Sequence, residues 1–139
     1  MTRVLLDINV ILDVLQKREP HYEAAAKVLS LCADGKIKGY VSATSFGTLH
    51  YLLSKSIGKA KSMIALKKIR AITSVASIDG EAIDLAIAST FSDFEDAIQY
   101  YCAIRNGLDQ IITRNKKDFS KAKLIVSTPE EFLGTLTQT

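Results

Sequence analysis

Short aliphatic runs alternate with longer segments of helical periodicity along almost the whole chain, and this alternation constrains the fold more than any other feature. The runs that predict strands span residues 3–6, 40–41, 75–78, 109–113 and 123–126. The segments between them predict helices, because their apolar residues recur at intervals of three and four. Strands that alternate with helices favour a mostly parallel sheet with right-handed crossovers. We therefore expect an α/β fold, a three-layer sandwich with helices on both faces of a central sheet.

Local signals refine two of the predicted helices. A basic segment over 59–71 has helical spacing that predicts burial of Met63 and Ile64, with its lysines facing solvent. Ser92 and Glu95 stand three residues apart, the spacing of a capping box, and predict the start of a later helix.

Composition limits the number of domains and the class of protein. The chain has 139 residues, of which 47% are hydrophobic, so it is expected to form one domain over 1–139 around a single core. Cys32 and Cys102 are far apart and form no CxxC or Cys/His cluster, which excludes a zinc knuckle and a disulfide framework. Asp7 and Asp13 interrupt the first apolar run, so we expect a cytoplasmic protein without a membrane segment. The net charge of +3 is compatible with a nucleic-acid partner.

Polar side chains follow two of the predicted strands, where ligand sites form in open parallel sheets. Asp7 ends the first strand, and Asn115 follows the fourth, with Asp118 three residues later. Asp93 and Asp96 share one face in the first turn of a helix. Carboxylates that converge without histidine or thiolate favour Mg²⁺ or Mn²⁺, and such ions assist phosphodiester hydrolysis. We therefore predict a metal-dependent nuclease with Asp7, Asp96 and Asp118 as metal ligands and catalytic residues.

Neighbouring polar residues receive supporting roles. Asn9 lies two residues after Asp7 and is expected to hydrogen-bond a metal ligand, whereas Asp13 is interpreted as a solvated helix residue. Asp93 and Asn9 are therefore minor candidates for the site. Three cations, Arg114, Lys116 and Lys117, flank the acids and are candidates for steering RNA phosphates, although a solvated surface is the simpler interpretation for such residues.

Three segments together resemble PIN-domain proteins: VLLDINVILD over 4–13, DFEDA over 93–97 and ITRNKKDF over 112–119. The family includes the VapC-type toxins of prokaryotic toxin–antitoxin pairs, which are Mg²⁺- or Mn²⁺-dependent ribonucleases with four acidic residues at the edge of a parallel sheet. The resemblance implies that Asp7 is the first acid and Asp96 the third, with Asn115 and Asp118 sharing the fourth position. It also implies an RNA substrate, a small antitoxin partner and a homodimer.

The chain departs from this family pattern at two positions. The second acid of the family falls near Thr48, and no Asp or Glu occurs from Lys36 to Ile78. Asn115 stands where many relatives carry aspartate, although its amide oxygen can still ligate a metal. A catalytically weakened or inactive PIN-like domain that binds RNA or protein is therefore an alternative. A further alternative function is phosphotransfer on Asp7, as in haloacid dehalogenases or receiver domains. Those dehalogenases, however, need an aspartate where this chain has Asn9.

Overall fold

The computed structural model describes residues 1–119 and 122–136. Its centre is one parallel sheet with the strand order β3-β2-β1-β4-β5. The strands are β1 (Arg3–Leu6), β2 (Lys38–Ser42), β3 (Ser74–Ala76), β4 (Gln110–Ile112) and β5 (Ile125–Ser127). Each predicted strand is present with boundaries that differ by at most two residues, and the predicted parallel sheet is confirmed.

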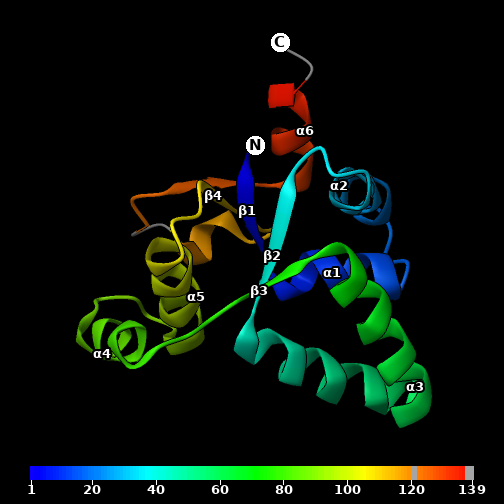
Figure 1. Ribbon diagram of the computed structural model, residues 1–139, viewed down its shortest axis with the longest axis horizontal. Coiled ribbons are helices and arrows are strands. Elements are labelled where there is room, and N and C mark those ends of the chain that lie inside the picture. Colours follow the sequence, from blue (N-terminus) through cyan, green and yellow to red (C-terminus); the bar gives the residue numbers. More distant parts are fainter. Residues whose placement is uncertain (120–121, 137–139) are drawn as a thin grey trace.

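Six α-helices and a short 3₁₀-helix surround the sheet in the described residues. They are α1 (Ile8–Leu15), α2 (Tyr22–Ala33), α3 (Ala43–Ile72), α4 (Gly80–Ala88), α5 (Phe94–Arg105), the 3₁₀-helix η1 (Lys116–Phe119) and α6 (Pro129–Leu136). Helices α1, α2 and α3 lie on one side of the sheet, and α4 and α5 lie on the other (Figure 1). The three-layer α/β sandwich predicted from the sequence is therefore confirmed.

Alternate residues of the central strand supply two separate apolar cores, one on each face of the sheet. Val4 and Leu6 pack with residues of α1, α2, α3 and α6, whereas Leu5 packs with residues of α5. All three side chains are fully buried. Successive residues of a strand point to opposite faces, so a strand covered on both faces must be apolar throughout. This requirement explains why the sequence of β1 reads as an uninterrupted aliphatic run.

The long helix α3 has two segments that meet at Gly58, and the second of them contains the helix predicted over 59–71. The backbone of Gly58 has φ 83°, which favours glycine and bends the helix. In the second segment Ile69 is buried, but Met63 and Ile64 are 48% and 55% exposed. The prediction that both are hidden was therefore wrong, since periodicity marks an apolar face without showing that another element covers it.

Both cysteines are buried and unpaired. Burial raises the pKa of each thiol to about 11, so Cys32 and Cys102 stay protonated at neutral pH and behave as small core residues. No helix in the described ranges 1–119 and 122–136 combines the length and the apolar character needed to span a bilayer.

The connection order places a topological switch point at the middle of the sheet. From β1 the chain adds β2 and β3 on one side, and then crosses to add β4 and β5 on the other. Leu6 at the end of β1 pairs with Ile112 at the end of β4. In sheets of this type the loops after the two strands at the switch point leave in opposite directions and form a crevice at the carboxyl edge, where ligands bind.

Candidate active site

Asp7 stands at this crevice and is held by three hydrogen bonds. It caps α1, since its Oδ1 accepts from the backbone N–H of Ile8 at 2.8 Å. Its Oδ2 accepts from the hydroxyl of Thr113 at 2.7 Å and from the Nδ2 of Asn9 at 3.1 Å. The carboxylate therefore has a fixed position between the ends of β1 and β4.

The pKa of Asp7 is raised, and burial is the largest cause. The hydrogen bonds from Thr113, Ile8 and Asn9 oppose this shift, whereas the negative charge of Asp118 adds to it. The raised pKa means that burial disfavours the charged carboxylate of Asp7 more than its three donors stabilise it.

Helix α5 brings the second group of acids to the same crevice. Asp93, rather than Ser92, caps this helix, because its Oδ1 accepts from the backbone N–H of Asp96 at 3.0 Å. The predicted capping box of Ser92 and Glu95 was therefore wrong by one residue. Asp93 has a structural role as the cap, and its minor role at a metal stays a prediction.

Asp96 is half-buried, and its pKa is raised to about 7. Burial is the largest cause, followed by repulsion from Asp93, Asp7, Asp118 and Glu95. Because Asp7 and Asp118 both act on Asp96, the three acids named from the sequence share one electrostatic environment. They come from β1, α5 and η1, which are far apart along the chain.

The loop after β4 carries the last two candidate residues. The backbone N–H of Asn115 donates to the Thr113 hydroxyl at 3.1 Å, and the N–H of Asp118 donates to the carbonyl of Asn115 at 3.0 Å. Both side chains are exposed to solvent. Within residues 1–119 and 122–136, no three His, Cys, Asp or Glu side chains are arranged to enclose a metal ion. The ligand roles of Asp7, Asp96, Asp118 and Asn115 therefore stay predictions.

Thr113 is a residue that the sequence analysis missed. Its side chain is fully buried, and its hydroxyl donates to Asp7 while accepting from the Asn115 backbone. Asn9 donates to both Asp7 and Thr113, at 3.1 and 3.3 Å. The predicted contact between Asn9 and an acid of the site is thus present. A polar residue directly after a buried strand was the available signal for Thr113.

Asp13 was wrongly interpreted as solvated. Its side chain is 1% exposed, and it accepts from the Nε and Nη2 of Arg114 at 2.9 and 3.1 Å. The backbone N–H of Arg114 also donates to Asn9. Of the cations expected to steer RNA, Arg114 is thus paired inside the protein, and Lys116 is paired with Glu131 at 3.1 Å. Asp13 and Glu131 therefore compete with RNA phosphates for the positive charges of Arg114 and Lys116. The two ion pairs also connect the loop after β4 to α1 and α6.

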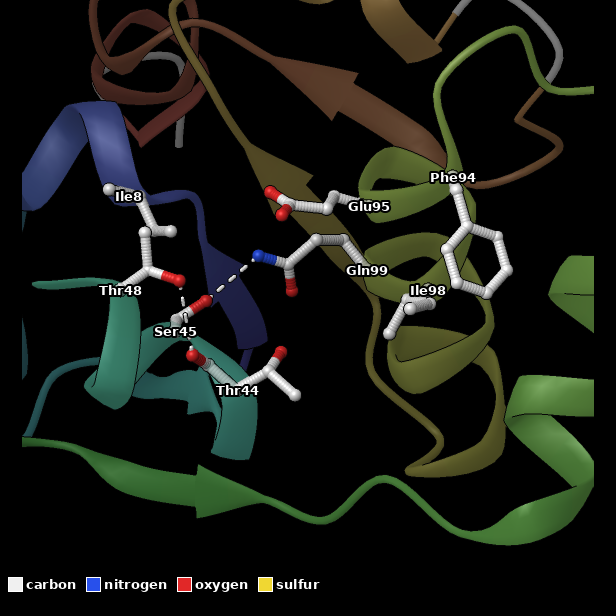
Figure 2. A pocket seen from close by; sticks show the side chains of 8 residues that line it. All are labelled: Ile8, Thr44, Ser45, Thr48, Phe94, Glu95, Ile98 and Gln99. Carbon is white, nitrogen blue, oxygen red and sulfur yellow. Dashed lines mark hydrogen bonds between the residues drawn. The ribbon is translucent and has the colours of Figure 1, made fainter.

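A pocket lies next to these acids, between α3 and α5 (Figure 2). Thr48, near which the resemblance places the family's second acid, lines it from α3, and Glu95 lines it from α5. Figure 2 shows the Glu95 carboxylate extending from α5 toward the α3 side. The sequence analysis gave Glu95 only a capping role, but the shift of the cap to Asp93 leaves its side chain available to this pocket.

The oxygen donors at the crevice suit a hard divalent cation. Mg²⁺ keeps several waters and binds through one or two carboxylates together with substrate phosphates, so it does not need a cage of protein ligands. The raised pKa values of Asp7 and Asp96 indicate an excess of negative charge that such a cation would offset. The residues present therefore fit Mg²⁺ or Mn²⁺.

Comparisons with known proteins agree with the fold. The PIN domain family profile matches residues 3–117. The chain is 28% identical over 135 residues to "Ribonuclease VapC1" of Aquifex aeolicus (strain VF5), a match that covers 94% of this chain and 92% of that relative. The chain belongs to the PIN-domain family.

Solved structures support the same architecture. The structure of VapBC2 from Rickettsia felis, bound to a DNA fragment from its promoter, matches with a TM-score of 0.71 and 18% identity, over 91% of this chain and 98% of that chain. VapC20 from Mycobacterium tuberculosis, described as a sarcin-ricin loop cleaving toxin, matches with a TM-score of 0.67 and 16% identity, over 88% of this chain and 96% of that chain. At these identities the likeness establishes the fold.

Proposed function

We propose that this protein is a divalent-metal-dependent endoribonuclease and the toxin of a toxin–antitoxin pair. One observation carries the proposal: the carboxylates of Asp7, Asp96 and Asp118, from three distant segments, act on one another at the switch point of the sheet. Membership in the PIN-domain family supports it, as do relatives described as a ribonuclease and as an RNA-cleaving toxin.

Asp7, Asp96 and Asp118 would hold the cation, with the amide oxygen of Asn115 as a further ligand. When bound, a divalent cation supplies Lewis-acid stabilisation to the phosphodiester during in-line displacement. Thr113 and Asn9 orient the Oδ2 of Asp7 and so keep one ligand in place before substrate arrives. Asp96, whose pKa is about 7, carries a proton on part of the molecules at neutral pH and must release it to act as a ligand.

Cleavage of single-stranded RNA by the purified protein with Mn²⁺ tests the proposal. We expect Asp7→Asn to abolish cleavage, because the amide keeps the shape of the side chain but removes its charge. Asp84→Asn, at an exposed acid on α4, is the matched control and should cleave as the unchanged protein does. Residual cleavage that is equal in Asp7→Asn and in the unchanged protein would rule out the proposed site.

A second candidate function is RNA or protein binding without cleavage. Thr48 favours it, because this residue places a hydroxyl where the family has its second carboxylate. RNA binding that Asp7→Asn leaves intact, combined with no Mn²⁺-dependent cleavage by the unchanged protein, would select this alternative.

Three further properties belong to the proposal. We infer a cytoplasmic protein, a homodimer and a small antitoxin partner that covers the acidic crevice. Co-purification of the chain with the product of an adjacent small gene, and loss of nuclease activity in that complex, would test the partner.

A further inference from the structure

The pocket between α3 and α5 has features that the acids do not explain. It has a volume of about 220 Å³ and is lined by polar side chains of α3, by Ile8 and by the outer face of α5. Sites for drug-sized molecules usually exceed about 300 Å³, so this pocket suits a single heterocycle. Because Ile8 follows Asp7 and Glu95 precedes Asp96, the pocket opens directly beside the proposed catalytic acids.

Gln99 presents an unsatisfied polar atom to this pocket. Its side chain is 7% exposed, and its Nε2 donates to the Oγ of Ser45 at 2.9 Å. The Ser45 hydroxyl is itself fixed by a 2.7 Å hydrogen bond with Ser42. The Oε1 of Gln99 has no hydrogen-bond partner in the described part of the chain. A buried acceptor without a donor is costly, and it is the kind of group that a binding site retains for its ligand.

Helix α5, which carries Gln99, also supplies an aromatic surface to the pocket. Phe94 is the first residue of α5 and is 50% exposed, and it belongs to neither of the two cores. Its ring stands beside Ile98 at the edge of the pocket (Figure 2). Aromatic rings at nucleic-acid sites stack with bases, and this stacking tolerates any base because every base has a π-face.

We propose that this pocket binds one nucleobase of the RNA, adjacent to the phosphate that the acids cleave. The base stacks on Phe94, and one of its N–H groups donates to the Oε1 of Gln99. The hydroxyls of Thr44 and Thr48 line the same space and offer further partners to the edge of the base. The inference rests on the proposed ribonuclease function and adds to it a site that selects the nucleotide next to the cleaved bond.

Because the chain contains no tryptophan, Phe94→Trp creates a single fluorescent reporter at the pocket. Neutral nucleosides, titrated without any metal, are expected to quench its emission saturably, with a dissociation constant on the order of 1 mM. Adding Gln99→Met should weaken this binding about tenfold, the value of one hydrogen bond to a buried acceptor. Tyr51→Trp, at a residue on the exposed part of α3, is the matched control and should show no saturable quenching.

Several results of this titration would overturn the proposal. Unsaturable quenching that is equal in the Phe94→Trp and Tyr51→Trp proteins would exclude a base site. Saturable quenching by N-acetyl-leucinamide but by no nucleoside would assign the pocket to a protein ligand instead. If Gln99→Met unfolds the chain, as judged by circular dichroism, Thr44→Val at the exposed rim serves as the second variant and should weaken nucleoside binding severalfold.

The cleavage pattern gives an independent measurement. On RNA of randomised sequence with Mn²⁺, the unchanged protein should favour one base beside the cleaved bond, and Gln99→Met should reduce this preference about tenfold. Gln16→Met, at the end of α1, should leave the preference unchanged. A preference that survives Gln99→Met would overturn the inference while the ribonuclease proposal stands. If no RNA is cleaved at all, the ribonuclease proposal fails, and the metal-free titration still decides whether the pocket binds a base.

Discussion

Replacing Arg114 by methionine tests the buried ion pair that joins α1 to the loop after β4. The substitution keeps an unbranched side chain but removes both hydrogen bonds to Asp13, at 2.9 and 3.1 Å. The Asp13 carboxylate, 1% exposed, would then face only Arg18, whose Nη1 lies 3.9 Å away. Breaking a fully buried pair costs about 3–5 kcal/mol. Because Arg114 is 29% exposed and Arg18 remains, we expect a loss of about 2–3 kcal/mol in the free energy of unfolding.

Substitution of the partner residue, Asp13, should lower the free energy of unfolding by less than Arg114→Met does. This difference between the two variants makes the test specific to the buried charge. Asp13→Asn keeps one acceptor for Arg114 and leaves a guanidinium that already reaches solvent, so the expected loss is about 1 kcal/mol. The double variant Asp13→Leu with Arg114→Met removes both charges and should be more stable than Arg114→Met alone.

Urea unfolding followed by far-ultraviolet circular dichroism measures these differences, with the slope against urea expected to stay constant. Lys116→Met, which removes the exposed pair with Glu131, is the matched control and should cost less than about 0.5 kcal/mol. If Arg114→Met and Lys116→Met lost the same stability, the structural role given to the Asp13–Arg114 pair would be refuted.

Three further predictions concern the acids and their supports. The pKa of Asp96 is about 7 in the folded protein against 3.8 for the free side chain, so its contribution to stability falls as pH rises from about 4 to about 7. In EDTA, Asp96→Asn should therefore stabilise the protein at pH 8 by about 1–2 kcal/mol, a value reduced for solvent screening, and should not stabilise it at pH 4. Urea unfolding measures both effects, and equal effects at the two pH values would contradict this prediction. Thr48→Glu should tighten Mn²⁺ binding about tenfold in calorimetry, because it adds a carboxylate near the expected position of the family's second acid, with Glu130→Gln on α6 as the neutral control. Thr113→Val should lower Mn²⁺ affinity about 10- to 100-fold because Asp7 loses its hydroxyl donor, and an unchanged affinity would remove Thr113 from the site.

The parts of the fold that were predictable are those that depend on local pattern. The aliphatic run of β1 and its terminal Asp7 indicated a buried parallel strand with an acid at its carboxyl end. Parallel strands share one edge, so the convergence of Asp7 with the loop after β4 followed from the fold class alone. The electrostatic coupling of Asp96 to both Asp7 and Asp118 agrees with that expectation.

Other features depend on contacts that no local pattern shows. Asp13 and Arg114 are 101 residues apart in the sequence, and nothing near either residue indicates the other. The cap of α5 was misplaced because Ser92 and Asp93 are adjacent and both are good caps. Because Asp93 is the cap, the side chain of Glu95 does not cap the helix and instead lines the pocket. Gln99 was also missed, because an amide in a helix is usually solvent-exposed and its burial depends on Ser45 across the pocket.

The acids of the crevice are dispersed along the polypeptide, and this dispersal delays the onset of activity during synthesis. Asp7 accepts a hydrogen bond from the hydroxyl of Thr113, which follows it by 106 residues, and the negative charge of Asp118 also acts on it. A nascent chain shorter than this cannot close the crevice, since β4 is needed beside β1. A nuclease built in this way would be harmless to the RNA of the ribosome that makes it until the segment through Asp118 has been synthesised and has folded.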